Sequence, residues 1–173
     1  TDSLKWNVAE NELPMWVADM DFPTAPCIIN ALKKRVEHGI FGYTRVPEEY
    51  YDAVISWFSR RHHWKPRREW FIYTSGVVPA LSAVIKALTN VGDKVLTLTP
   101  VYNCFSIDYE DLERRAADPK TTLMLLCNPH NPSGRVWTRE ELQRIGDICI
   151  RNNVVVVADE IHCELVHPGF TYT

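Results

Sequence analysis

The stretch TTLMLLCNPHNPSG, residues 121–134, joins an apolar run to a stiff turn. The apolar part has no polar alternation, which is typical of a strand buried on both faces of a parallel sheet. The turn contains two Asn-Pro dipeptides and a glycine, residue types that favour tight turns. A second apolar run, NVVVVA at 153–158, ends at Asp159 and Glu160. The two runs, with a helical pattern between them, predict parallel strands.

Helical patterns alternate with strand patterns through the rest of the chain. Thr138 and Glu141 are spaced as a capping box for the helix between the two apolar runs. Gly39 is placed to end an earlier helix. Further strands are expected at WFIYT (70–74) and KVLTLT (94–99), and further helices at 28–36, at 48–58, from 78 to about 89 and within 106–121. The alternation predicts an α/β fold, doubly wound around a mostly parallel sheet.

Composition and charge narrow the class of partner. The 173 residues are 46% hydrophobic and 24% charged, as in an ordinary globular protein. A net charge of -3 provides no basic field for nucleic acid or an acidic membrane. The basic stretch RRHHWKPRR (60–68) could contact nucleic acid, but it also fits the positively charged C-terminus of a helix.

Location is predicted from what the sequence does not contain. No apolar run approaches the roughly 20 residues that span a bilayer, and the polar N-terminus lacks a signal-peptide core. Five cysteines without paired spacing predict buried thiols in a reducing compartment. The expected location is therefore the cytoplasm.

The carboxyl ends of the predicted strands carry the candidate functional residues. Ligands of open parallel sheets bind beyond these ends. The residues found there are Gly76, Tyr102, Asn131 and Asp159, with His162 just downstream. Together they predict one binding site.

Each candidate taken alone has a plain structural alternative. Asp159 could hold a protonated pyridine nitrogen, or it could cap a helix or pair with an arginine. Backbone N–H groups after Gly76 could bind a phosphate, although a tight turn also explains the glycine. Tyr102 could stack on a planar heterocycle, and the Asn131 amide could donate to an oxyanion. The histidines near the C-terminus match no usual zinc spacing, so no metal site is predicted.

Four segments together resemble the pyridoxal-phosphate (PLP) dependent transferases of fold type I. They are SGVVPAL (75–81), GDKVLTLTPVYNCF (92–105), LLCNPHNPSGRVWTREEL (125–142) and VVVVADEIHCEL (154–165). The segments PMWVADMDF (14–22) and FGYTRVPEEYYDAVISWF (41–58) are similar to the branch that holds cystathionine β-lyases and related C–S lyases. The resemblance covers nearly the whole chain from about Leu13 onward.

The resemblance implies PLP as the cofactor and gives the candidates their roles. Asp159 would keep the ring nitrogen protonated and Tyr102 would stack on one face of the ring, as the catalytic residues of this chain. Ile161 would pack near the other face. Asn131 and His162 would serve the phenolate oxygen of the ring, and Asn131 would also reach the substrate carboxylate.

The remaining roles concern the phosphate and the substrate. The phosphate would be held by three backbone N–H groups, those of Gly76, Val77 and Val78. Tyr43 would reach the phosphate of a neighbouring subunit, which implies a homodimer with shared sites. Val17 and Ala18 would border the substrate pocket.

The resemblance also implies that the chain is part of a longer enzyme. Residues 1–40 would form an N-terminal arm and helix belonging to the small domain, and residues 41–173 an incomplete PLP-binding large domain. A C-terminal part, with the Schiff-base lysine and the arginine that binds the α-carboxylate, would lie beyond Thr173. A segment would be absent between Phe105 and Ser106, where the crossover of about a dozen residues that parallel strands need is abrupt.

The function implied is that of a C–S β-lyase of the cystathionine β-lyase type. Such an enzyme of amino-acid metabolism cleaves sulfur amino acids to a thiol, pyruvate and ammonia. An aminotransferase using the same residues is the nearest alternative. A non-catalytic regulatory protein of the same fold, for instance one that binds a transcription regulator, is an alternative of another class.

Overall fold

The computed structural model describes residues 2–16, 19–98 and 107–172. The described chain falls into two compact units, Thr1–Pro66 and Arg67–Thr173. The assignment of residues 1–40 to a small domain and 41–173 to a large domain follows the family resemblance and stays a prediction. The predicted join of Phe105 to Ser106 lies outside the described residues. No helix in the described part of the chain is long and apolar enough to cross a membrane.

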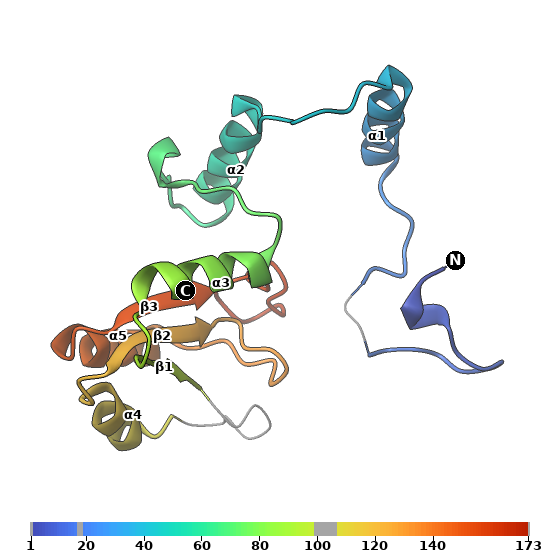
Figure 1. Cartoon of the computed structure of the whole chain (residues 1–173). Coiled ribbons are helices and arrows are strands. Elements are labelled where there is room, and N and C mark those ends of the chain that lie inside the picture. The colour runs from blue at the N-terminus through green and yellow to red at the C-terminus, as the bar shows by residue number, and fades with distance from the viewer. Residues whose placement is uncertain (1, 17–18, 99–106, 173) are drawn as a thin grey trace. The chain divides into compact units, whose positions relative to one another are not determined.

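The second unit is built on a three-stranded parallel sheet (Figure 1). Its strands are β1 (Lys94–Thr97), β2 (Thr121–Cys127) and β3 (Val155–Asp159), side by side in that order. The parallel pairing confirms the predicted α/β class. The register pairs Cys127 with Asp159, so β2 and β3 end at the same level.

Helices cover both faces of this sheet (Figure 1). The side chains of β2 alternate between the faces. Met124 and Leu126 pack into the core with α4 (Tyr109–Ala116) and α5 (Arg139–Arg151). Leu125 points the other way and borders a cavity with Leu81 of α3 (Val77–Leu88). This two-sided covering confirms the predicted doubly wound arrangement. The core cluster is Leu112, Ala116, Met124, Leu126, Trp137, Ile145, Ile148, Cys149 and Val154.

The capping box predicted at the start of α5 is confirmed. The Glu141 backbone N–H donates to Thr138 Oγ1 at 3.2 Å, and the Thr138 N–H donates to the Glu141 carboxylate at 2.9 Å. We expect Thr138→Ala to lower the free energy of unfolding by about 1 kcal/mol. Thr138→Ser keeps the hydroxyl acceptor and should lower it much less. Urea denaturation of both variants is the measurement, and equal losses would contradict the cap.

The first unit contains a short 3-10 helix at Leu4–Trp6, then α1 (Pro26–His38) and α2 (Glu48–Arg61). Gly39 ends α1 in the left-handed region at φ 70°, as predicted, because a residue without Cβ adopts this conformation at little strain. The apolar face predicted for α1 forms, but its members Leu32 and Val36 are 60% and 66% exposed.

One predicted strand is wrong. Residues 71–74 form no strand, and Ile72 is 89% exposed. Apolar residues favour a strand only where a neighbouring strand supplies backbone hydrogen-bond partners. The short helix at Arg68–Trp70 replaces the beginning of the predicted strand.

Two expectations about burial also need correction. The valine run was expected to be covered on both faces, yet Val155 and Val156 of β3 are 48% and 38% exposed; β3 is one of the two edge strands of the described sheet. The cysteines were expected to be buried thiols. Cys149 is buried and Cys27 on α1 is exposed, while the described cysteines are free as expected.

Candidate functional site

The carboxyl ends of β2 and β3 place the NPHNPSG turn beside Asp159. The backbone N–H of Asn128 donates to the Asp159 carbonyl oxygen at 3.0 Å, one step beyond the last residue pair of the two strands. The segment carrying His162 then leaves from Asp159. Two of the predicted site segments therefore start from the same edge of the sheet, as the parallel arrangement requires.

Asp159 lines a small cavity of about 170 Å³ at this edge. Its side chain is half-buried, and its Oδ1 accepts the backbone N–H of Ile161 at 3.1 Å. Among the described residues that line this cavity, only Asp159 carries a carboxylate, so a cation entering the cavity would meet it. The other residues of the lining, most of them apolar, are Leu81, Thr97, Leu98, Leu125, Leu126, Cys127, His130 and Val157.

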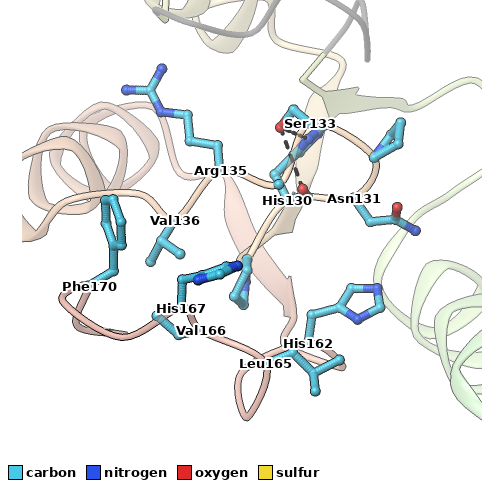
Figure 2. Close-up of a pocket in the computed structure, with 13 residues that line it drawn as sticks. His130, Asn131, Ser133, Arg135, Val136, His162, Leu165, Val166, His167 and Phe170 are labelled. Atoms are coloured by element: carbon cyan, nitrogen blue, oxygen red, sulfur yellow. Dashed lines mark hydrogen bonds between the residues drawn. The ribbon is translucent and has the colours of Figure 1, made fainter. Parts of the chain in front are cut away.

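Asn131 and His162 line a second, larger pocket of about 690 Å³. One wall is the turn after β2 and the other is the segment that follows β3. Figure 2 shows the two side chains near one end of this pocket, Asn131 extending from the first wall and His162 from the second. The two residues that the resemblance assigns to the same phenolate oxygen therefore line one pocket.

The structure divides the predicted residues between these two cavities. Asp159 lies on the smaller one, Asn131 and His162 lie on the larger one, and His130 borders both. Tyr102, together with the predicted substrate residues Val17 and Ala18, lies outside the described residues. The single combined site stays a prediction.

The predicted phosphate donors lie at the start of α3. Gly76 is the N-cap residue and Val77 and Val78 are the first helical residues, while Pro79 in the third position has no N–H to donate. Among the described residues no side chain caps this helix start. Leu81, one turn further along α3, lines the cavity of Asp159. Uncapped N–H groups at a helix N-terminus favour an anion.

The other two predicted residues are strongly exposed. Ile161 is 62% exposed and meets Asp159 through its backbone N–H. Tyr43 belongs to the first unit and its side chain is fully exposed. Exposure leaves Tyr43 accessible to another subunit, so its predicted role there remains open to test.

Sequence reasoning missed the residues that brace the turn. Asn128 is 3% exposed, and its Oδ1 accepts the backbone N–H of Trp137 at 3.2 Å. The indole Nε1–H of Trp137 donates to the Cys127 carbonyl oxygen at 2.9 Å. Arg135 stacks over the Trp137 ring at 4.4 Å and forms an ion pair with Glu141. Asn128, the first asparagine of the motif, was the available signal for these contacts, since turn geometry alone does not require an asparagine at that position.

His130 is buried inside the turn, with 5% of its surface exposed. Its Nδ1 lies 2.8 Å from Ser133 Oγ, and its backbone N–H donates to the Arg135 carbonyl oxygen at 2.7 Å. These contacts make His130 a structural part of the NPHNPSG turn. Burial lowers the pKa of the imidazole, because a charged ring loses hydration in this position.

The lowered pKa of His130 makes stability depend on pH. The unfolded chain binds this proton more tightly than the folded one, so the free energy of unfolding should fall as the pH drops below the unfolded value of about 6.5. His130→Gln should flatten the decline between about pH 7.5 and about pH 5.5, where the paired carboxylates do not yet titrate. Urea unfolding across this range measures it, and an unchanged slope in the variant would assign the decline to another group.

A parallel sheet covered on both faces, with the Asp159 carboxylate at the end of β3 and the NPHNPSG turn after β2, places the second unit in the doubly wound α/β class. The family profile "Aminotransferase class I and II" matches residues 101–172. The chain is 43% identical to cystathionine beta-lyase PatB of Bacillus subtilis over 202 aligned positions, covering 100% of this chain and 52% of that protein.

Solved structures agree with the sequence matches. Cystalysin from Treponema denticola, which contains a pyridoxal 5'-phosphate cofactor, is 36% identical with a TM-score of 0.90, over 99% of this chain and 52% of that chain. A PLP-bound putative aminotransferase from Clostridium difficile is 43% identical with a TM-score of 0.85, over 92% of this chain and 47% of that one. The chain belongs to the PLP-dependent aminotransferase family of fold type I, and it is similar to proteins of the cystathionine β-lyase branch of that family. It spans about half the length of the curated relatives it matches.

Proposed function

We propose that this chain forms part of a PLP-dependent C–S β-lyase that cleaves sulfur amino acids to a thiol, pyruvate and ammonia. The observation that carries the proposal is the position of Asp159, a half-buried carboxylate at a strand end in a mainly apolar cavity. The relatives named as cystathionine β-lyases support the choice of reaction.

The residues present fit the proposed cofactor. PLP has a pyridine nitrogen that can be cationic and a phosphate that is anionic. Asp159 offers a carboxylate for the first, and the uncapped start of α3 offers the N–H groups of Val77 and Val78 for the second. Leu81 connects the two features, because it belongs to α3 and lines the cavity of Asp159.

The bound cofactor supplies an electron sink for the negative charge that develops on the substrate Cα. The Asp159 carboxylate would keep a proton on the ring nitrogen by pairing with the cation, and the apolar lining would strengthen this pairing. By the family resemblance, Asn131 and His162 would donate hydrogen bonds to the phenolate oxygen, and Asn131 would also orient the substrate carboxylate. Fixed donors at these atoms hold the scissile bond in place for elimination.

Other parts of the proposed enzyme come from the family resemblance. Tyr102 would stack on one ring face and Ile161 would lie near the other, while Val17 and Ala18 would border the substrate. The base that removes the proton from Cα is the family's lysine, which we place after Thr173.

We also propose a homodimer in the cytoplasm, with Tyr43 reaching the partner's phosphate. We propose that a segment of the family is absent between Phe105 and Ser106. The Bacillus alignment has 202 positions for the 173 residues of this chain, so that alignment contains positions that this chain does not fill.

Incubation of the full-length enzyme with L-cystathionine tests the function. We expect pyruvate to form without an added keto acid, as measured by coupling to lactate dehydrogenase. Product formation only when a keto acid is supplied would instead support an aminotransferase, the alternative favoured by the putative aminotransferase among the similar structures. A protein that neither turns over amino acids nor shows cofactor absorbance would support the non-catalytic regulatory alternative.

A further inference from the structure

His130 borders both cavities at the carboxyl end of the sheet, and among the described lining residues no other does so. The smaller cavity has the Asp159 carboxylate in its lining, and the larger pocket has Asn131 and His162. A single ligand that contacts both Asp159 and Asn131 would therefore lie beside His130. The free hydrogen-bonding groups of His130 then decide what it offers to such a ligand.

The imidazole of His130 is buried, with 5% of the residue exposed, and only one of its two ring nitrogens has a partner among the described residues. This nitrogen is Nδ1, which lies 2.8 Å from Ser133 Oγ (Figure 2). Fully buried side-chain nitrogens and oxygens in the described part of the chain all have a partner, so the other nitrogen, Nε2, is accessible. Because so little of His130 is exposed, a ligand atom reaches Nε2 through the cavities.

The contact with Ser133 indicates which ring nitrogen carries the proton. The Ser133 hydroxyl lies 2.8 Å from Nδ1 but 3.4 Å from the His130 carbonyl oxygen, so its single proton is better placed for Nδ1. When Nδ1 accepts, the proton of a neutral imidazole is on Nε2. Burial favours the neutral ring, since it lowers the pKa of His130. His130 thus presents a neutral N–H donor that has no acceptor among the described residues.

An N–H donor selects the ligand atom that it can face. A protonated pyridine nitrogen is itself a donor, and the carboxylate of Asp159 suits it. An anionic oxygen accepts from Nε2–H, and it relieves the unfavourable burial of an unpaired donor. A neutral imidazole also places no second positive charge beside the cationic ring. In PLP one ring atom separates the pyridine nitrogen from the carbon that bears the phenolate oxygen, so both groups can have the same neighbour.

We propose that His130 binds the cofactor through Nε2, as a donor to the phenolate oxygen, from the wall that the two cavities share. This gives a ligand contact to a side chain whose described contacts otherwise belong to the turn. The inference rests on the proposed function, because the placing of one PLP molecule on both Asp159 and Asn131 belongs to it.

The test uses the full-length protein and two substitutions that each keep a polar group near one ring nitrogen. His130→Gln places an amide near the position of Nε2, and His130→Asn places one near the position of Nδ1, facing Ser133. His63→Asn, at an exposed histidine of the first unit, is the matched control. Quenching of tryptophan fluorescence gives the dissociation constants of PLP and of an analogue with hydrogen in place of the phenolate oxygen.

We expect His130→Asn to bind PLP about tenfold more weakly than the wild type, as the loss of one hydrogen bond to an anionic oxygen predicts. It should also shift the absorbance maximum of bound PLP. His130→Gln should recover most of the affinity, and His63→Asn should match the wild type. The analogue should bind to His130→Asn as tightly as to the wild type, because it has no phenolate oxygen to lose.

Equal losses of affinity for PLP and for the analogue in His130→Asn would mean that His130 acts only through the turn, and would overturn the proposal. An unchanged PLP affinity in His130→Asn, or a larger loss in His130→Gln, would overturn it as well. A second measurement needs no substitution: the NMR signal of the Nε2–H proton in the wild type should move further downfield with PLP than with the analogue, and equal shifts would contradict the contact.

The same measurements separate this inference from the proposed function. A wild type that binds PLP but releases no pyruvate from L-cystathionine would defeat the lyase proposal alone, because the binding of PLP and of the analogue still reports on His130. A wild type that binds no PLP would defeat both proposals.

Discussion

Replacing Asp159 with asparagine in the full-length enzyme is expected to lower kcat about 100- to 1000-fold. Asparagine keeps the shape of the side chain and can still accept the N–H of Ile161, which lies 3.1 Å from Oδ1. It cannot pair with a cation, so the proposed ring nitrogen would lose its proton and the substrate Cα its stabilisation. Steady-state rates of pyruvate formation measure the effect.

The absorbance of the cofactor after gel filtration separates catalysis from binding in this variant. We expect most of the PLP to remain, because the donors at the start of α3 hold its phosphate in the proposed site. Asp147→Asn, an exposed carboxylate of α5, is the matched control and should behave as the wild type. Wild-type turnover by Asp159→Asn would refute the assignment, and a rate loss that follows the loss of cofactor would make Asp159 a binding residue only.

Replacing Trp137 with alanine should produce the largest change in stability. The side chain is 1% exposed and belongs to the core between the sheet, α4 and α5. Removing a buried indole leaves a cavity that neighbours fill only in part, so the free energy of unfolding should fall by about 3–5 kcal/mol. Urea denaturation followed by circular dichroism measures this change.

Two controls separate the packing of Trp137 from its hydrogen bond. Trp137→Phe keeps most of the volume but leaves the Cys127 carbonyl without the indole donor, so a loss of about 1–3 kcal/mol is expected. Trp70→Ala, at a site that is 53% exposed, should lose much less than Trp137→Ala. Equal losses at positions 70 and 137 would contradict the core position of Trp137.

The bracing of the turn links this stability to the proposed site. Trp137 holds both Cys127 and Asn128, and Asn131 follows three residues after Asn128. Loss of these hydrogen bonds should therefore move the amide of Asn131 as well as weaken the core. Trp137→Phe, which loses one bond and keeps the fold, is the variant in which weaker cofactor or substrate binding would show this link.

Much of the fold could be predicted because its signals are local. The apolar run before Cys127 marked β2, the spacing of Thr138 and Glu141 marked the start of α5, and Gly39 marked the end of α1. Each depends on contacts within a few residues, which the order of amino acids nearly determines. The strand predicted at 70–74 is wrong for the opposite reason. A strand depends on a partner strand elsewhere in the chain, which the local sequence does not specify.

The sequence by itself determined the α/β class, the parallel strands and the placing of Asp159 at a strand end, because hydrophobic period and turn chemistry are properties of short stretches. Only the tertiary structure decided that Asp159 and Asn131 line different cavities, both of which His130 borders. It also decided the bond of Asn128 to Trp137 and the pairing of Lys5 with Asp21. These contacts form when the folded backbone brings together residues separated along the chain, and no local pattern records which of them will meet.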